Sequence, residues 1–598
     1  MYTANVFMSV CVIRSKKREG VNSNTLHGKG MVMDRIDLRG KPFYLGDEAV
    51  RWVEETLQGM TDKEKVGQLF CEILWDRPGC SPEALLEDTE PGGVMYRPFS
   101  GEKMREYTER MQKKAKIPLL IACNLERGGS GGNGGLTDGT YVSSPMGCAA
   151  TDDAQSAYKL AEVACKEGGA AGVNWTFEPI VDIDLNPGNP ITNVRTYGSS
   201  PERIIRMAKG YMEACRRYGV ISTVKHFPGD GVDERDQHLM SSINSLPAQE
   251  WYESYGRIYK ELIDDGAPAV MCAHIKQPAL CREVDPGMKD EDIMPASLSR
   301  ELMQGILREK LGFNGLIVTD ATQMVGFTCS MPRHLAVPAA IERGADMFLF
   351  TINRKEDVGF MMEGLRKGLL SRKRLDEAVT RILALKAHAG LWKRPAIPSK
   401  EGLSCLRCPE HLAAAREIAE RSITLVKDRE QCLPLSPEKM RKVKLIQITN
   451  EKLPAGGLLP EIELFKSLLE KEGFEVSYFK DGRFPGEDCS LAEFKKETDL
   501  MIYFANMKVG SNQTTIRIVW DDFLGEDSPK YVKDIPVLFL SFSNPYHLVD
   551  VPMVGTYINA YTCNEESVYA MVEKLMGRSP FLGHSPVDPF AGLWDTRL

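Results

Sequence analysis

Short apolar runs alternate with amphipathic stretches across the first two thirds of the chain. The amphipathic stretches, of which 153–167, 201–218 and 299–311 are examples, repeat apolar residues at helical spacing. The apolar runs have the length of buried strands and fall at 72–75, 93–96, 118–123, 175–181, 220–225, 269–273, 316–319 and 347–350. Eight strands that alternate with helices predict an α/β fold with a (β/α)8 barrel of the TIM type. A doubly wound sheet is the competing arrangement, because strand spacing alone does not show that a sheet closes.

A proline-rich, charged stretch from Trp392 to Pro398 ends this pattern. After it, the sequence predicts a helix at 410–421 and strands at 443–448, 500–504, 537–542 and 557–561. We therefore expect a barrel domain at 46–393, a linker at 394–409 and a smaller α/β sandwich domain at 410–598. Residues 1–45 are polar and aperiodic, which predicts a poorly ordered extension with Met31 and Met33 as alternative starts.

The 598-residue chain carries a formal net charge of −8, which gives no reason to expect nucleic acid or an anionic membrane as a partner. No apolar run approaches the length of a transmembrane helix, and the N-terminal stretch has its charges after its apolar part, unlike a secretory leader. The 15 scattered cysteines fit a reducing compartment better than a disulfide framework. We expect a cytoplasmic monomer or homodimer.

A glycine run at 128–135 contains a GxGxxG match that begins at Gly129. A dinucleotide site needs a helix to open there, and the residues that follow show no helical pattern. The lone CxxC formed by Cys405 and Cys408 has no second pair near it, and the chain contains no HExxH or Walker sequence. We therefore expect no cofactor and no metal site.

Polar residues gather where the predicted strand at 220–225 ends. Lys225 and His226 close the strand, and the charged loop that follows places Asp236 two residues before His238. A TIM-type barrel builds its active site at the C-terminal ends of its strands. An aspartate at this spacing can orient a histidine and stabilise its charge. A solvated acidic loop with one stray histidine is the alternative interpretation.

Three further strand ends or loops carry candidate side chains. Asp320 follows the run at 316–319, where a carboxylate can act as a nucleophile or general base, or can simply cap the next helix. Arg195 can bind a substrate hydroxyl or carboxylate, or can pair with Asp182 and Asp184. His274 follows the run at 269–273, either as a site residue or as a buried core histidine.

Taken together, these segments resemble glycoside hydrolase family 3, and within it the β-N-acetylglucosaminidase branch. The resemblance covers nearly everything after Asp47. It rests on MTDKEKVGQL, PGGVM, NVRTYG, KHFPGDG followed by DQH, VMCAHI, PASLS and GFNGLIVTDATQM, with AREIAERSITLVKD and GRSPFLGHSPV in the second domain. KHFPG, an Asp-x-His pair and GLIVTD in this order are a very specific combination.

The resemblance implies a retaining hydrolase in which Asp320 is the nucleophile. It implies that His238, held by Asp236 on a mobile loop, acts first as the acid and then as the base. Most retaining glycosidases use two carboxylates for these roles, so the histidine is unusual.

The family's sugar-binding residues match Arg195, Lys225 and His226, and we expect His274 and Met324 in the same pocket. Two segments depart from the family pattern. The family shows a DQEGGR-like segment with a sugar-binding aspartate where this chain reads NLERGG, which leaves Asn124 and Glu126 for that task. Asp230 replaces the histidine of the family's KHFPGHG.

We therefore expect an exo-β-N-acetylglucosaminidase that removes terminal N-acetylglucosamine from amino-sugar oligosaccharides or glycosides during cell-wall recycling. A β-glucosidase of the same family is an alternative, although that branch takes its acid/base from the second domain. A phosphorylase is another, because an imidazole repels phosphate less than a carboxylate does. An inactive carbohydrate-binding protein is the non-enzyme alternative. The second domain could contribute to the pocket, to dimerisation or only to stability, and its sequence does not decide among these roles.

Overall fold

The computed structural model describes residues 36–75, 81–87, 90–130, 135–393, 397–454, 456–481, 484–486, 488–520 and 525–598. Within it, Asp37–Leu598 make up one structural unit. Most of the expected N-terminal extension lies outside the described residues, as do residues 131–134 of the glycine run and residues 394–396 of the expected linker. Phe43 and Leu45, at the end of the expected extension, are buried.

Eight parallel strands form a closed barrel. They are β1 (Phe70–Leu74), β2 (Gly93–Tyr96), β3 (Leu120–Cys123), β4 (Trp175–Thr176), β5 (Thr223–Phe227), β7 (Ala269–Cys272), β9 (Leu316–Thr319) and β10 (Phe348–Leu349). Hydrogen bonds connect β10-β1-β2-β3-β4 and, separately, β5-β7-β9. Parallel bridges join the two sheets, Trp175 to Ile221 on one side and Val318 to Met347 on the other. The barrel prediction is therefore confirmed over the doubly wound sheet.

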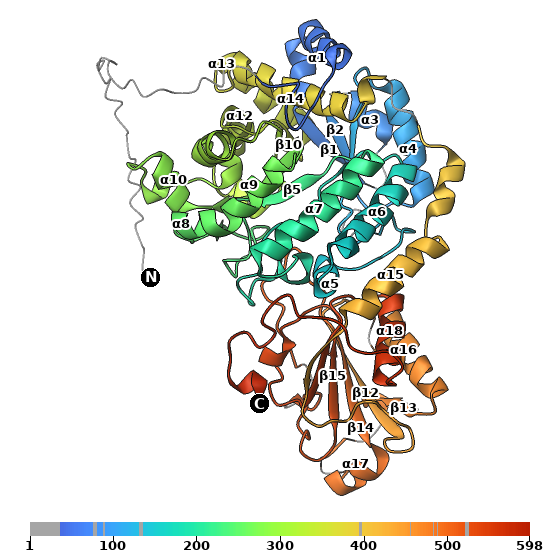
Figure 1. Cartoon of the computed structure of the whole chain (residues 1–598). Coiled ribbons are helices and arrows are strands. Elements are labelled where there is room, and N and C mark those ends of the chain that lie inside the picture. The colour runs from blue at the N-terminus through green and yellow to red at the C-terminus, as the bar shows by residue number, and fades with distance from the viewer. Residues whose placement is uncertain are drawn as a thin grey trace, which may run out of the picture. The chain divides into compact units, whose positions relative to one another are not determined.

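Helices follow the strands and cover the outside of the barrel (Figure 1). The longer ones are α1 (Asp47–Gly59), α2 (Asp62–Gln68), α4 (Gly101–Lys114), α6 (Ala154–Ala170), α7 (Pro201–Tyr218), α9 (Arg257–Asp264), α12 (Arg333–Glu342), α13 (Arg354–Lys367) and α14 (Arg372–His388). Shorter helices are α3 (Pro82–Glu87), α5 (Pro145–Ala150), α8 (Ala248–Trp251), α10 (Pro278–Val284) and α11 (Val325–Thr328), and a π-helix spans Glu301–Lys310. None of the described helices is long and apolar enough to cross a membrane.

Helix α7 shows how local sequence sets these bounds. The Ser200 side chain accepts the Arg203 N–H at the helix start, and Pro201 occupies the first turn, where its missing N–H costs nothing. Gly219 ends the helix at φ 68°, a left-handed conformation that glycine adopts without strain. The chain then returns along the barrel into β5, whose end carries Lys225 and His226.

The predicted strand bounds agree with the observed ones to different degrees. The predicted strand at 316–319 coincides with β9, whereas the one predicted at 175–181 is the two-residue β4. Pro179 has no N–H to donate to a sheet, and beyond it only an isolated bridge from Ile180 to Lys225 continues the pairing. The structure also contains a small pair of parallel strands that was not predicted. It consists of β6 (Ser242–Ile243), which follows the loop that carries His238, and β8 (Ile275–Lys276), which follows β7.

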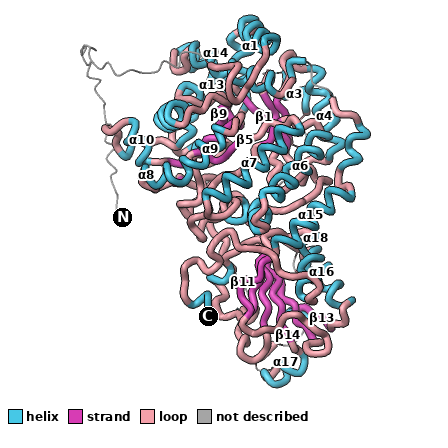
Figure 2. The backbone as a smooth tube through the Cα atoms, in the orientation of Figure 1, coloured by secondary structure: helices cyan, strands magenta, loops and turns pink. Residues whose placement is uncertain are grey.

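The C-terminal domain contains one six-stranded sheet (Figure 2). Its strands lie in the order β11-β16-β15-β14-β12-β13, and only β11 runs antiparallel to its neighbour. Their bounds are β11 (Thr424–Asp428), β12 (Lys442–Thr449), β13 (Glu475–Tyr478), β14 (Leu500–Asn506), β15 (Val537–Ser541) and β16 (Thr556–Asn559). The four predicted strands correspond to β12, β14, β15 and β16. The two edge strands were missed because their residues are only partly apolar.

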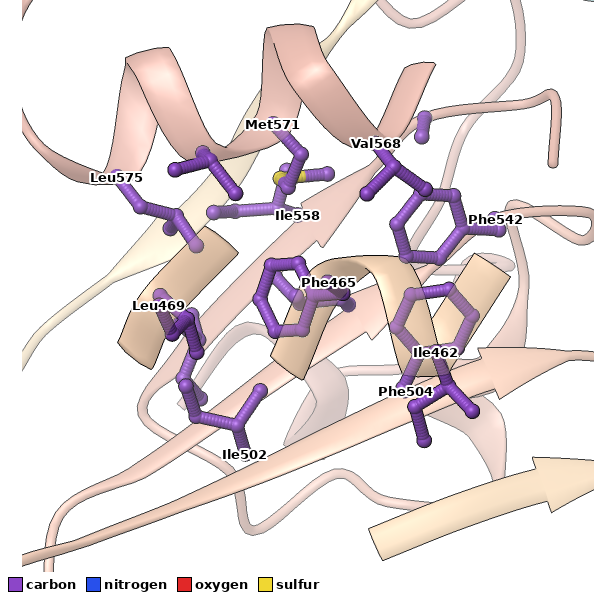
Figure 3. Packing of buried hydrophobic residues seen from close by; sticks show 14 of the residues in the cluster. Ile462, Phe465, Leu469, Ile502, Phe504, Phe542, Ile558, Val568, Met571 and Leu575 are labelled. Atoms are coloured by element: carbon purple, nitrogen blue, oxygen red, sulfur yellow. The ribbon is translucent and has the colours of Figure 1, made fainter. Parts of the chain in front are cut away.

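Helices α15 (Pro409–Ser422), α16 (Pro460–Lys471) and α18 (Glu565–Leu575) pack against one another beside this sheet, and α17 (Leu491–Glu497) follows β13. Phe465 of α16 and Met571 of α18 meet Phe504 and Ile558 of the sheet in one buried cluster (Figure 3). Each such side chain contributes about 1.5–3 kcal/mol when fully buried. The predicted sandwich domain is therefore confirmed, with its own hydrophobic core.

Buried polar contacts join this domain to the barrel. The Tyr546 hydroxyl donates to Asp184 Oδ2 at 2.6 Å, and Asn193 Nδ2 donates to Asn544 Oδ1 at 3.1 Å. All four side chains are buried, and a buried polar group that loses its hydrogen-bond partner destabilises the folded state. The loop that carries Arg195 is therefore held from both domains.

Candidate active site

A cavity of about 680 Å³ opens at the C-terminal ends of the barrel strands. Eight of the ten residues predicted for the site line it, namely Asn124, Glu126, Arg195, Lys225, His226, His238, Asp320 and Met324. Asp236 and His274 are the other two, and both lie behind the lining residues. The barrel thus brings together side chains that are up to about two hundred positions apart in the sequence, as parallel strand ends do.

Asp320 follows β9, and among the described residues no lysine or arginine forms an ion pair with it. Its backbone N–H donates to Cys272 O at 2.8 Å, which continues the strand pairing, and its Oδ1 accepts the Ala321 N–H at 2.7 Å. Burial opposes ionisation, but the nearby His226 and His238 and the Ala321 N–H outweigh it, so the pKa of Asp320 lies below its usual value. Asp320 is therefore ionised and free to act as a nucleophile.

Asp236 and His238 form a hydrogen-bonded pair. The His238 ring donates from Nδ1 to Asp236 Oδ1 at 2.6 Å, and the His238 backbone N–H donates to the same oxygen at 2.9 Å. Asp236 is 1% exposed, whereas the His238 side chain is 26% exposed and reaches the cavity. Since Nδ1 is occupied, Nε2 is the nitrogen left to exchange a proton with a substrate.

Two buried pairs at the end of β5 hold Lys225 and His226. Lys225 Nζ donates to Glu178 Oε1 at 2.8 Å, and His226 Nδ1 donates to Asp182 Oδ2 at 2.7 Å. The Lys225 ammonium group and the His226 ring are therefore each oriented by a carboxylate, as ligand-binding side chains commonly are. The free donors of both residues face the cavity.

Arg195 pairs with Glu126 rather than with Asp182 or Asp184. Its Nε and Nη2 donate to the Glu126 carboxylate at 3.0–3.1 Å, and its Nη1 donates to Ile191 O. Burial raises the pKa of Glu126, but the neighbouring arginines dominate and bring it to about 2. The two side chains fix one another in a forked ion pair at the cavity wall.

His274 is placed differently from the expectation that it lines the pocket. Its Nδ1 lies 2.7 Å from Ser297 Oγ and its Nε2 lies 3.0 Å from Ala321 O, so both ring nitrogens are used within the protein. Burial lowers its pKa to about 4, which keeps the ring neutral. We correct its role from substrate contact to support of the backbone beside Asp320.

Several lining residues were not singled out from the sequence. Arg127 lies beside Glu126, with its Nη1 3.2 Å from the Tyr141 hydroxyl and its Nε 3.7 Å from Glu126 Oε1. The adjacency of Glu126 and Arg127 at a strand end was the available signal. From the second domain, residues 508–513 line the cavity after β14. Their Gly-Ser-Asn composition at the end of a parallel strand was the corresponding signal.

Asp230 also lines the cavity, next to Asp182. Its Oδ1 accepts Asn189 Nδ2 at 3.0 Å and the Gly231 N–H at 2.7 Å, while its own N–H donates to Asp182 Oδ1. Burial and the adjacent Asp182 charge raise the pKa of Asp230 to about 8. Asp230 is therefore protonated at neutral pH.

The site combines the ionised carboxylate of Asp320 with a carboxylate-held imidazole in one cavity. A nucleophile and a proton donor that face the same cavity can split a bond in two steps, first by attack and then by release of a covalent intermediate. The cations Arg127, Arg195 and Lys225 supply donors for hydroxyl or anionic groups.

Residues 61–385 match the family model described as "Glycosyl hydrolase family 3 N terminal domain". A β-N-acetylglucosaminidase/β-glucosidase of Cellulomonas fimi is 42% identical over 94% of this chain and all of its own length. A solved structure of a β-glucoside phosphorylase bound to 2FGlc is 62% identical, covers 93% of this chain and 99% of its own, and has a TM-score of 0.91.

The fold is shared more widely. A family 3 β-N-acetylglucosaminidase from a Paenibacillus strain is 24% identical over 90% of this chain, with a TM-score of 0.73. The family model, the full-length relative and the assembled site agree, and the chain belongs to glycosyl hydrolase family 3.

Proposed function

We propose that the protein is a retaining β-glycoside phosphorylase that transfers a terminal β-glucosyl residue through Asp320 to inorganic phosphate. The proposal is carried by one observation. The His238 imidazole lines the cavity, whereas its carboxylate partner Asp236 does not. A phosphate that approaches the leaving-group side meets a neutral or cationic ring there. The 62% identical β-glucoside phosphorylase supports the same activity.

The first step forms a covalent intermediate. Asp320 attacks the anomeric carbon, and His238 Nε2 gives its proton to the departing glycosidic oxygen, so the alcohol leaves neutral. The Asp320 carboxylate becomes an ester and loses its negative charge. Asp236 stabilises the imidazolium before transfer and keeps the ring in the tautomer with Nδ1 protonated.

The second step distinguishes phosphate from water. Phosphate already carries a nucleophilic oxygen, so it can attack the glycosyl ester without giving up a proton. Water must transfer a proton to His238 as it attacks. Attack by phosphate releases Asp320 as a carboxylate and yields a glycosyl phosphate with the original anomeric configuration, because two inversions restore it.

The charges around the cavity favour an anionic acceptor. Glu126 is paired with Arg195 and Asp182 with His226, while Asp230 is protonated. Esterification of Asp320 then removes a negative charge that no described lysine or arginine pairs with. The described cations that line the cavity are Arg97, Arg127, Arg195, Lys225 and Lys508. An anion is attracted to such a site more strongly than water is.

The β-N-acetylglucosaminidase activity expected from the sequence is the second candidate. It is favoured by the Cellulomonas fimi relative, whose name gives both an acetylglucosaminidase and a glucosidase activity, and by the Asp236–His238 pair.

We also propose a cytoplasmic location, because every cysteine among the described residues has a free thiol.

The direct test is to incubate the protein with 4-nitrophenyl β-glucoside or the matching N-acetylglucosaminide, with and without phosphate. We expect phosphate to accelerate turnover and to appear as β-glucose 1-phosphate in ³¹P NMR spectra. A product that is only free sugar, at saturating phosphate, would contradict the phosphorylase and leave a hydrolase. The ratio of kcat/KM between the two substrates decides the glycone.

Replacement of the nucleophile should abolish turnover. We expect Asp320→Asn to lower kcat by at least about 10⁴-fold on either aryl glycoside, because no covalent intermediate can form. Glu234→Gln is the matched control, because Glu234 is an exposed carboxylate on the loop that carries His238. We expect this variant to change kcat by less than about twofold. Retention of most activity by Asp320→Asn would show that another residue is the nucleophile.

A carboxylate at the acid/base position should repel phosphate. With 2,4-dinitrophenyl β-glucoside, whose leaving group needs no proton, we expect His238→Glu to lower the ratio of phosphorolysis to hydrolysis by about tenfold or more. His238→Gln, which is neutral, should keep the wild-type preference for phosphate. Equal product ratios for the two variants would contradict the electrostatic account.

Ionisation of Asp230 should weaken phosphate use at alkaline pH. Its pKa of about 8 means that the group is neutral below this pH and adds a negative charge above it. We expect kcat/KM for phosphate in wild type to fall, relative to Asp230→Asn, by about tenfold between pH 7 and pH 9. The ratio between the two proteins removes the titration of phosphate itself, and a constant ratio would contradict the prediction.

A further inference from the structure

A loop of the C-terminal domain enters the active site. Residues 508–513 follow β14 and line the same cavity as Asp320 and His238, which belong to the barrel. The sequence left the role of this domain open between the pocket, dimerisation and stability. The loop makes one specific contact with the catalytic machinery.

That contact is a hydrogen bond to Asp236. The backbone N–H of Asn512 donates to Asp236 Oδ2 at 2.8 Å. The other oxygen, Oδ1, accepts both the backbone N–H and the ring Nδ1 of His238. With both oxygens engaged and the side chain fully buried, the carboxylate cannot rotate away from the imidazole.

The loop is built to present this N–H. Asn512 adopts φ 67°, in the left-handed region that asparagine tolerates better than most residues. Lys508 N–H donates to Asn450 Oδ1 at 2.8 Å, while Asn450 Nδ2 and Gln513 Nε2 both donate to Lys508 O at 3.0 Å. These bonds close the loop onto the end of the sheet.

Packing also anchors the loop at the junction of the two domains. Val509 is 3% exposed and belongs to a buried cluster that includes Met146 and Val194 of the barrel and Tyr546 of the C-terminal domain. Val194 directly precedes Arg195, and Tyr546 bonds to Asp184. The position of the Asn512 amide relative to Asp236 is therefore set by the docking of one domain on the other.

We propose that Asn512 is a positioning residue for general acid catalysis, through which the C-terminal domain holds the Asp236–His238 pair in its working orientation. The proposal rests on the proposed cleavage step, in which His238 protonates the leaving group. The acid and its partner come from the barrel, but their geometry depends on a backbone amide of the second domain. The C-terminal domain is thus required for acid catalysis and not only for stability.

The electrostatics agree with this geometry. Burial of Asp236 opposes its ionisation, but the hydrogen bonds from His238 and Asn512 outweigh burial and hold the pKa of Asp236 below its usual value. An ionised Asp236 is the form that can hold Nδ1 protonated and leave Nε2 directed at the cavity.

The test uses leaving groups that differ in their need for a proton. Glycolic acid incorporated at position 512 replaces only the backbone N–H by oxygen and leaves the left-handed φ of 67° accessible, which proline would not. Asn512→Gly keeps both the N–H and the left-handed backbone and is the matched control. On phenyl β-glucoside we expect the glycolic-acid variant to lower kcat/KM by about 10- to 100-fold, as loss of a hydrogen bond to a charged group does. On 2,4-dinitrophenyl β-glucoside it should stay within about threefold of wild type, because acid assistance is not needed there.

A double-mutant cycle with Asp236→Ala shows whether the effect passes through the pair. If Asn512 acts by way of Asp236, the glycolic-acid variant at position 512 causes no further loss on phenyl β-glucoside in the Asp236→Ala background. Independent, multiplicative losses would overturn the proposal. Equal losses of the glycolic-acid variant on both substrates would overturn it too, since they would indicate general damage to the cavity.

Two further measurements keep the test decisive. Asn512→Gly is measured on both substrates and should match wild type on each, because it keeps the N–H. His238→Ala is measured in parallel. Should wild type cleave neither aryl glucoside, the proposed function fails. Should His238→Ala show the leaving-group dependence and the glycolic-acid variant lack it, only the positioning role fails.

Discussion

The site depends on keeping one carboxylate charged and unpaired inside the mouth of the barrel. An isolated buried carboxylate is costly and tends to take up a proton. Asp320 avoids this because the nearby His226 and His238 and the Ala321 N–H hold its pKa low. A lysine or arginine beside it would stabilise the charge equally well, but an ion pair would also reduce its nucleophilicity. Imidazoles provide a weaker field that leaves the oxygen available.

The other acidic side chains of the cavity are each given a separate partner. Glu126 is bound by Arg195, Asp182 by His226 and Asp236 by His238, whereas Asp230 is held protonated. This arrangement orients the donors that line the cavity, and it isolates Asp320 as the charge that the proposed reaction would remove. The protonation states of the site therefore follow from pairing and burial rather than from residue type.

The two domains are joined at the points where the site needs precision. Asp184, just ahead of the Arg195 loop, accepts from Tyr546, and Asp236 accepts from the Asn512 amide. Both carboxylates are buried, so their hydrogen bonds are strong and directional. Loops that carry catalytic residues are usually the most mobile parts of a fold, and here the second domain restrains two of them.

The sequence alone predicted the barrel and the second α/β domain, and its resemblance to family 3 supplied the hypothesis that Asp320 is the nucleophile and Asp236 and His238 the acid/base pair. Buried parallel strands are continuous apolar runs, and Asp320 and His238 lie directly in or after segments whose pattern is local. Only the tertiary structure decided that Arg195 pairs with Glu126, that both ring nitrogens of His274 are hydrogen-bonded within the protein and that Asn512 reaches Asp236. These contacts join residues 69, 47 and 276 positions apart, and such distances are set by strand closure and domain docking, which leave no periodic signal in the chain.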